Sequence, residues 1–318
     1  MQKNHKPGQF KEFERLDSEK WNYGRLMIGI TFLFPFRVVG LLIAVVIYLS
    51  LVYICTIGHD FNKPFSMWRR ILFKITNKIF PRIALFYCGY ITITSKSVDD
   101  YDYSKWLGKD YNKPDFCVGS VSNHSAWTDL FVMLFRTGGV SFVSKDSIKK
   151  TPLFGKVGIA LNTIFFNRVG SKEEKQKIVE EIGKRQKTIF AAKGNGLSLH
   201  IFPEGMTTNN SHLLPFKRGV FESLLPLKPL VVKYSSSEFN PAHDVMPMHI
   251  HLVVLMSQFT NSLEVTDLPI FEPNKYLYET HRKADQQNWE VYANAVRECM
   301  SDISGLPTSE ASIKDKNE

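Results

Sequence analysis

The sequence contains few cysteines and no paired cysteine spacing. Its four cysteines, Cys55, Cys88, Cys117 and Cys299, lie far apart along 318 residues. This pattern excludes a disulfide-stapled fold and suits a reducing, cytosol-facing domain. A cleaved signal peptide is not expected, because a long polar segment precedes the first apolar run and no small-residue cleavage site follows it.

The sequence also lacks the motifs of nucleic-acid-binding proteins, although it is basic. Its formal net charge is +9, its pI is about 9.2, and aromatic residues make up 13%. Such a charge suits either nucleic acid or anionic lipid, but zinc-ligand spacing, an aromatic ribonucleoprotein motif and a basic-zipper pattern are all missing. We therefore expect a lipid surface as partner and no nucleic acid.

One long apolar run is present, from Val38 to Ile57, and it has no charged residue. About 20 apolar residues cross the hydrocarbon core of a bilayer, so this run is long enough. A second apolar stretch, Met27 to Phe36, precedes it, with Pro35 and Arg37 at the junction. The pattern fits one kinked span, a re-entrant pair of short helices, or an interfacial segment followed by a span.

The orientation of this segment is left open by its flanks. Lysine and arginine are abundant on both sides of the run, so the positive-inside rule gives no bias. Both flanks in the cytosol would require a hairpin. Residues 67–90 then alternate apolar side chains with cations, as expected of an interfacial amphipathic helix or of an ordinary helix packed on the domain.

Beyond residue 90, strand-like and helix-like segments alternate. This pattern predicts an α/β domain with a mixed sheet flanked by helices, behind an N-terminal hydrophobic membrane-anchoring helical segment. We expect strands at 90–94, 116–121, 140–143, 164–166, 197–202 and 229–233, and helices at 127–135, 153–161, 172–190 and 285–300. The apolar stretch 249–258 reads as a further buried strand, on which His249 and His251 share a polar face without a third metal ligand.

A histidine followed five residues later by an aspartate stands between a predicted strand and helix. These residues are His124 and Asp129. An aspartate that accepts a hydrogen bond from one ring nitrogen leaves the other nitrogen free to take a proton from a substrate hydroxyl. The alternative is a helix-terminal histidine beside an ordinary first-turn acid. Ser125 lacks the Gly-x-Ser-x-Gly elbow of a serine hydrolase, so we do not expect it to be a nucleophile.

Other polar residues follow predicted strands and suggest ligand contacts. Arg168 follows a strand and could form a hydrogen-bonded fork to a phosphate, or be a surface arginine. Glu204 could bind a glycerol hydroxyl or order its loop, and Gly205 lets the backbone approach a ligand. Lys217 and Arg218 are either phosphate-binding cations or a solvated basic turn.

Four short segments, in order, resemble the boxes of the glycerolipid acyltransferase family. They are His124 to Asp129, the incompletely matched 162–168, 202–205 (Phe-Pro-Glu-Gly) and the proline-centred 225–232. Later residues, including 207–209, 213–219 and 233–234, resemble the branch that reacylates lysophosphatidylcholine and lysophosphatidylethanolamine.

Two positions depart from the pattern of the family. Asn162 replaces the usual glycine, and asparagine tolerates the same left-handed backbone. Met206 replaces the usual threonine and removes a hydroxyl beside the site, for which Thr207 could substitute.

The resemblance implies transfer of a fatty acyl chain from acyl-coenzyme A to the free hydroxyl of a lysophospholipid. His124 would be the base, with Asp129 orienting it, and no bound cofactor or metal is expected. A lysophosphatidic acid acyltransferase or a coenzyme-independent transacylase would use the same boxes. A non-catalytic lipid-binding membrane protein with a decayed site is the alternative from another class.

These patterns divide the chain into five segments. They are a polar N-terminal segment (1–25), a membrane anchor (26–58), an amphipathic linker helix (59–90), an acyltransferase domain (91–303) and a disordered tail (304–318). The end of the tail, 314–318, resembles a dilysine retrieval signal, which predicts the endoplasmic reticulum membrane with the active site facing the cytosol.

Overall fold

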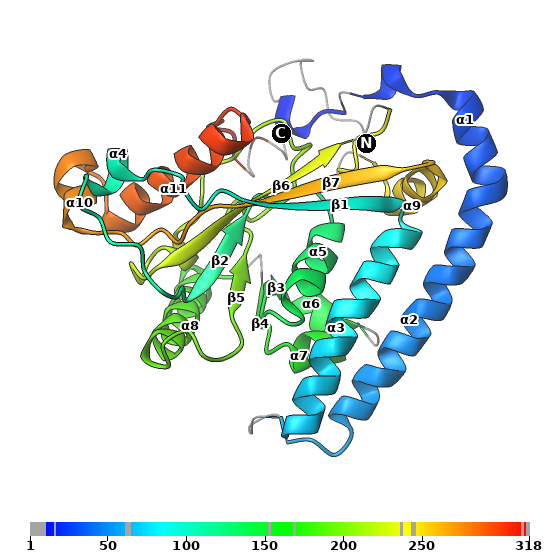
Figure 1. Ribbon diagram of the computed structural model, residues 1–318, viewed down its shortest axis with the longest axis horizontal. Coiled ribbons are helices and arrows are strands. Elements are labelled where there is room, and N and C mark those ends of the chain that lie inside the picture. Colours follow the sequence, from blue (N-terminus) through cyan, green and yellow to red (C-terminus); the bar gives the residue numbers. More distant parts are fainter. Residues whose placement is uncertain are drawn as a thin grey trace.

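The computed structural model describes residues 11–15, 17–60, 65–151, 154–167, 170–235, 238–242, 246–312 and 315. Its centre is a five-stranded sheet in the order β1-β7-β6-β2-β5 (Figure 1). These strands are β1 (Tyr90–Ser97), β2 (Gly119–Ser122), β5 (Leu199–Ile201), β6 (Leu227–Ser235) and β7 (Asn261–Asp267). Strands β6, β2 and β5 are parallel, whereas β7 runs antiparallel to β6 and parallel to β1. The predicted mixed sheet is confirmed.

Helices cover both faces of this sheet. On one face lie α4 (Ser104–Leu107), α8 (Lys172–Ala191), α10 (Lys275–His281) and α11 (Asn288–Ser304). On the other lie α3 (Met67–Tyr87), α5 (Thr128–Thr137), α7 (Phe154–Ala160) and α9 (Met248–Ser257). Strand β6 alternates between the two cores, with Val231 in the first and Leu230 and Val232 in the second, as a strand buried on both faces requires.

A small parallel pair of strands, β3 (Val143–Lys145) and β4 (Ile164–Phe166), stands beside the main sheet, with α6 (Asp146–Lys149) following β3. The strand expected at 140–143 is therefore displaced along the chain. The cause is Ser141, which forms a single bridge to β5, since its N–H donates to Ser198 O at 2.9 Å.

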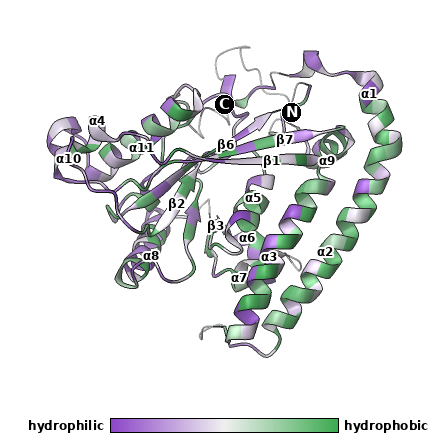
Figure 2. Cartoon of the chain, in the orientation of Figure 1, coloured by the Kyte–Doolittle hydropathy of each residue, from purple (hydrophilic) through white to green (hydrophobic). Residues whose placement is uncertain are grey.

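The N-terminal apolar segment forms a helical hairpin with α3. α1 (Tyr23–Ile28), a π-helical turn (Gly29–Leu33) and α2 (Phe34–Thr56) make one continuous helix, and α3 packs back along α2 (Figures 1 and 2). Pro35 has no N–H, and the turn before it is π-helical, with the N–H of Phe34 bonded to Gly29 O. The structure thus selects one continuous helix over two short ones. Among the residues described, this is the one helix long and apolar enough to cross a bilayer.

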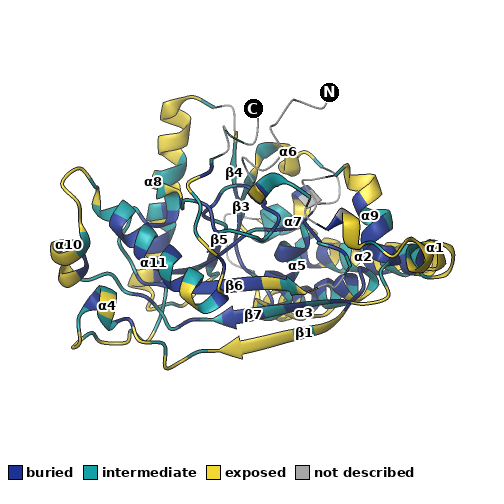
Figure 3. Cartoon of the chain, turned by 90° about the horizontal axis from the view of Figure 1, so that it is seen from above, coloured by how far each residue is buried: buried dark blue, intermediate teal, exposed yellow. Residues whose placement is uncertain are grey.

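Helix α3 has features of both predicted kinds of helix, one packed on the domain and one with an exposed apolar stripe. Phe73, Asn77 and Leu85 are buried where α3 packs on α2 and α5. Ile71, Ile75 and Ile79 form a stripe four residues apart that is about half exposed. In Figure 3, where the ribbon is coloured by burial, the end of the hairpin at α1 is largely marked as exposed.

The hairpin is fastened to the domain at Arg37, a buried cation at the start of the apolar run. Its guanidinium donates to the carbonyls of Met256, Gln258 and Phe259 at 2.8, 2.5 and 3.1 Å. These carbonyls lie at and just beyond the carboxyl end of α9, where helix carbonyls have no partner within the helix. At Gly29 a Cβ would lie 1.9 Å from Ser257 O, so only glycine allows this close approach.

Two further sequence expectations were wrong. The stretch 249–258 is helix α9, not a strand, because a nearly uniform apolar run has no period to distinguish the two. On a helix, His249 and His251 no longer share a face. The tail is ordered through residue 312, because Leu306 and Ala311 are buried and Leu213 bridges Thr308. Lys314 and 316–318, which carry the retrieval pattern, lie outside the described residues.

Candidate active site

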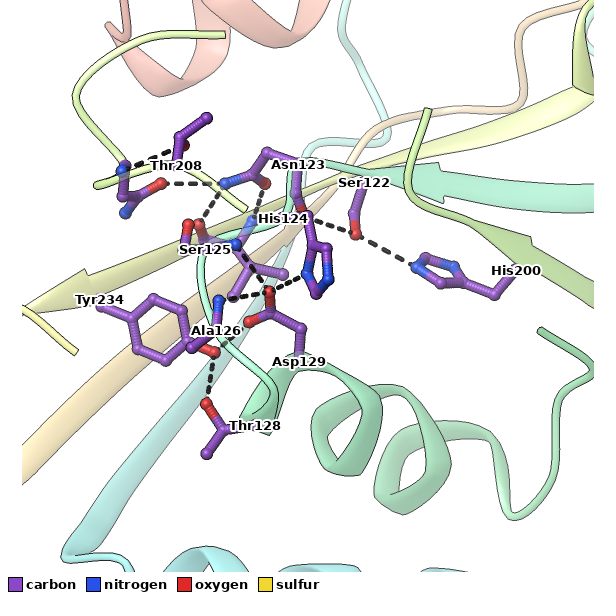
Figure 4. Close-up of polar contacts among 12 residues, drawn as sticks. Ser122, Asn123, His124, Ser125, Ala126, Thr128, Asp129, His200, Thr208 and Tyr234 are labelled. Carbon is purple, nitrogen blue, oxygen red and sulfur yellow. Dashed lines mark hydrogen bonds and ion pairs between the residues drawn. The ribbon is translucent and has the colours of Figure 1, made fainter. Parts of the chain in front are cut away.

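The predicted histidine and aspartate meet at the carboxyl end of β2. The strand ends at Ser122, and the side chain of Asn123 then extends the pairing of β2 with β6. Its Oδ1 accepts from Val232 N, and its Nδ2 donates to Val232 O, both at 2.8 Å. The chain turns at 124–127 and enters α5 at Thr128, which carries Asp129 back toward His124 (Figure 4).

Asp129 is buried, and each of its carboxylate oxygens has a donor. Oδ2 accepts from His124 Nδ1 at 2.7 Å and from the backbone N–H groups of Ser125 and Ala126 at 2.8 and 3.0 Å. Oδ1 accepts from the hydroxyl of Tyr234. A buried carboxylate requires such a set of donors to stay ionised.

The bond to Asp129 fixes the tautomer of His124. Because an ionised carboxylate can only accept, Nδ1 carries the proton and Nε2 is left to act as acceptor. The imidazole is held flat against Phe202, with ring centroids 4.0 Å apart and planes 15° apart. His124 is therefore oriented on two sides, and its side chain is 18% exposed. An imidazole held in this way can act as a general base.

Tyr234 is a site residue whose role the sequence did not reveal. It lies 105 residues from Asp129 and donates to it, while Thr128 Oγ1 lies 3.0 Å from the tyrosine oxygen and must be the donor there. Burial, and the nearby charge of Asp129, raise the pKa of Tyr234 well above its usual range, so the phenol keeps its proton. The alternation Leu230, Val232, Tyr234 along β6 was the available signal.

Ser125 is not hydrogen-bonded to His124 in this geometry. Its hydroxyl is buried and has no hydrogen-bond partner within the described part of the chain, so no bond links it to His124. This agrees with the missing elbow motif.

Beneath the site, His200 bridges Ser120 Oγ and Ser122 Oγ at 2.8 and 3.2 Å, and burial lowers its pKa to about 3. His200 is therefore neutral, and its two ring nitrogens hold two serine hydroxyls of β2 in place.

Glu204 lies close to the pair but beneath the surface. It is 1% exposed, and neither carboxylate oxygen has a partner in hydrogen-bonding geometry among the described groups. Burial, reinforced by Asp129, raises its pKa well above the usual range, although the nearby backbone N–H groups of His124 and Leu214 oppose the shift. A protonated Glu204 that orders its loop fits this position better than direct contact with a ligand.

The remaining predicted residues are only partly brought together. Gly205 has φ +69°, and a Cβ there would lie 2.5 Å from Lys217 Nζ, so the exposed lysine folds over the glycine. Thr207 is buried nearby. Arg218 instead pairs with Glu222 at 2.7 Å and reaches Gln176 on α8, which favours the reading of a basic surface turn. Arg168 lies outside the described residues.

The two departures from the family pattern have structural explanations. Asn162 adopts φ +53°, the left-handed conformation in which asparagine replaces glycine with little strain. Met206 is 5% exposed and packs with Leu214 and Ala311 in a small apolar cluster, with Phe13 against it. The methionine side chain therefore fills this apolar cluster.

An N-terminal strap, residues 11–15 and 17–22, fixes the loop that carries Glu204. The Asn209 side chain donates to Lys11 O and Glu14 O at 2.5 and 2.8 Å, and its N–H donates to Glu12 O at 3.0 Å. The next residue back, Thr208, donates its N–H to His124 O at 3.0 Å. The segment that sequence alone described as polar is therefore part of the scaffold of the site.

Part of the chain is similar to known proteins. Residues 118–235 match the family described as Acyltransferase. The chain is 27% identical to a lysophospholipid acyltransferase of Arabidopsis thaliana, over 78% of this chain and 63% of that protein. It is 26% identical to the lysophosphatidylcholine acyltransferase of Drosophila melanogaster and 23% identical to lysophosphatidylcholine acyltransferase 1 of Homo sapiens, over 89% of this chain and 49% of each relative.

The chain spans about half to two thirds of the length of these relatives. Among solved structures, the 1-acyl-sn-glycerophosphate acyltransferase PlsC of Thermotoga maritima is similar, with a TM-score of 0.46 and 16% identity. That alignment covers 86% of this chain and 100% of the other.

Proposed function

Because residues 118–235 form an acyltransferase family domain, we propose that this protein is a lysophospholipid acyltransferase that uses acyl-coenzyme A. The relatives named for lysophospholipid or lysophosphatidylcholine substrates support the acceptor class. The observation that carries the proposal is the 2.7 Å bond between His124 Nδ1 and the fully bonded carboxylate of Asp129.

The proposed reaction needs no covalent enzyme intermediate. His124 Nε2 takes the proton from the free hydroxyl of the lysophospholipid as that oxygen attacks the thioester carbonyl. The resulting imidazolium is stabilised by Asp129, whose charge is held by Tyr234 and two backbone N–H groups. Collapse of the tetrahedral intermediate forms the ester and expels the coenzyme A thiolate, which takes the proton back from His124.

The hairpin supports a membrane location. The strap packs on the domain before α1, and α3 leads directly into β1, so both ends of the hairpin return to the domain. If α2 crossed the bilayer, α3 would therefore have to cross it as well. Helix α3 carries Arg70, Lys74, Lys78 and other cations, and burying each charge at the bilayer centre costs about 2.5–3.5 kcal/mol. Embedding the hairpin in the leaflet next to the domain avoids this cost.

We further propose that the protein is located in the endoplasmic reticulum membrane, with the site facing the cytosol.

Product analysis by mass spectrometry tests this function. Detergent-solubilised wild type and His124→Ala receive a mixture of lysophospholipids with labelled acyl-coenzyme A. Labelled diacyl product from wild type alone is expected, and its mass identifies the head group.

Each other result has a separate meaning. Equal product from His124→Ala would overturn the role of His124. Product only when a diacyl phospholipid replaces acyl-coenzyme A would identify a transacylase, and lipid binding without any product would identify a non-catalytic lipid-binding protein.

A further inference from the structure

A groove of about 720 Å³ lies between α3, the end of α5 and the sheet. Cys117, Ser198 and Lys228 line it, and they stand at the amino ends of β2, β5 and β6. His124 lies beyond the opposite, carboxyl end of β2. The groove is therefore a separate site, reached from the other end of the parallel strands.

The charges in the groove are predominantly positive. Four cations, Lys78, Arg82, Arg136 and Lys228, line it together with one acid, Asp267. Asp267 is shared by Arg136 at 2.8 Å and Lys228 at 3.3 Å, whereas Lys78 and Arg82 have no acidic partner among the described residues. An excess of positive charge in a concave, partly apolar setting attracts anions.

Arg82 is already held in position to bind an oxyanion. Its two terminal nitrogens donate to the carbonyls of Tyr90 and Ile91 at 3.3 and 3.0 Å. A guanidinium has five N–H donors, so three are left for a ligand, in a fixed plane. A fixed arginine fork loses little side-chain entropy when it binds a phosphate.

The apolar part of the groove connects it to the exposed stripe of the hairpin. Ile79, Ile83, Phe135 and Leu230 line the groove, and Ile79 also belongs to the half-exposed stripe of α3 with Ile71 and Ile75. A ligand held here would place a charged head among the cations and apolar chains along α3. Anionic phospholipids have this chemistry.

We propose that this groove binds the phosphate-bearing head group of an anionic phospholipid, at a site distinct from that of the acyl acceptor. The same cations could bind free phosphate groups, such as the diphosphate of coenzyme A. The continuity of the groove with the exposed apolar stripe favours the lipid.

Cys117 provides a local probe. It lines the groove, and it is the one cysteine of the four that is not buried. The full-length protein in detergent is treated with N-ethylmaleimide near pH 8.5, because burial raises the pKa of this thiol, and the rate of alkylation is followed by mass spectrometry. The added probes are dioctanoyl phosphatidylserine, dioctanoyl phosphatidylcholine and inorganic pyrophosphate.

Phosphatidylserine is expected to slow alkylation of Cys117 at least threefold, with little effect of the other two probes. The exposed Lys78→Gln substitution should remove most of this protection without disturbing the fold, and Arg82→Lys should weaken it. Lys184→Gln, on α8 at the far side of the sheet, should leave it intact. Equal protection by phosphatidylcholine, protection by pyrophosphate alone, or unchanged protection in Lys78→Gln would each overturn the proposal.

Discussion

We call the region formed by His124, Asp129, Glu204 and Tyr234 the polar corner. There, polar groups are buried among apolar ones, whereas along the hairpin apolar groups are exposed. Asp129 is fully buried yet accepts four hydrogen bonds. Ile71 and Ile75 on α3 are 48% and 49% exposed and have no such compensation in water. The hydrogen bonds of Asp129 are completed within the protein, whereas the described residues leave the apolar stripe of the hairpin half exposed.

This difference separates two kinds of stability. The polar corner depends on a network of directional hydrogen bonds, so the loss of one donor affects His124 Nε2, the reacting nitrogen. In the proposed membrane location, the hairpin depends on non-directional burial of apolar area in lipid, so its response follows the total area lost. Substitutions in the two regions should therefore change different observables.

The largest effect is expected from placing charge on the exposed stripe of the hairpin. The double substitution Ile71→Asp and Ile75→Asp removes two apolar side chains worth about 1.5–3 kcal/mol each when buried, so binding to vesicles should fall about 100-fold or more. Vesicle flotation measures this loss, and activity on short-chain monomeric substrates should persist.

The matched control for the stripe is Ile71→Leu with Ile75→Leu, which keeps the apolar area and should bind normally. If the aspartate pair floated with vesicles as well as wild type does, α3 would not face lipid.

A smaller effect is expected at the corner from Tyr234→Phe, which removes the donor to Asp129 Oδ1. Hydrogen bonds to charged groups contribute about 1.5–3 kcal/mol, so kcat should fall roughly tenfold or more while KM changes little. Steady-state kinetics on the lysophospholipid identified by mass spectrometry provides the measurement.

Tyr90→Phe is the control for this substitution. Tyr90 is fully buried, with its ring 5.6 Å from that of Tyr234, but its hydroxyl makes no hydrogen bond to Asp129. Equal losses in the two variants would show that packing, not the bond to Asp129, is responsible.

The smallest effect concerns Glu204, the one acid of the corner that lacks well-formed hydrogen bonds. Burial raises its pKa in the folded state, so above about pH 4.5 the unfolded chain releases a proton that the folded protein retains. Stability is therefore lost as pH rises, by up to about 1.4 kcal/mol for each pH unit until the folded-state pKa is passed.

Glu204→Gln cannot ionise and should escape this loss. Its melting temperature should exceed that of wild type by a few degrees at pH 8, and the difference should shrink toward pH 5. A difference that is the same at both pH values would contradict a raised pKa, and thermal unfolding at the two pH values decides the matter.

Much of the site could be predicted because its central pair is local in sequence. His124 and Asp129 are five residues apart, on a strand end and the first turn of a helix, and this arrangement needs no distant contact. Tyr234 could not be placed in the same way. It reaches Asp129 only because β2 and β6 pair in the register that sets Ser122 opposite Leu230.

Other parts of the fold could not be predicted, for different reasons. The run of α9 is apolar throughout and therefore has no period, and the otherwise polar tail is held by a few buried residues, Leu306 and Ala311. Strand β7 does carry a signal, because Leu263 and Val265 alternate with polar residues. For the tail, local composition does not report which side chains will find a partner.

The sequence by itself determined the apolar run, most strands and helices, and the His-Asp pair, because periodicity and short spacing act over a few residues. Only the tertiary structure decided that the apolar helix folds back with α3, that Tyr234 and the N-terminal strap complete the site, and that four cations gather in one groove. Those features join residues up to about 200 positions apart, and their contacts exist only once the sheet order and register are fixed.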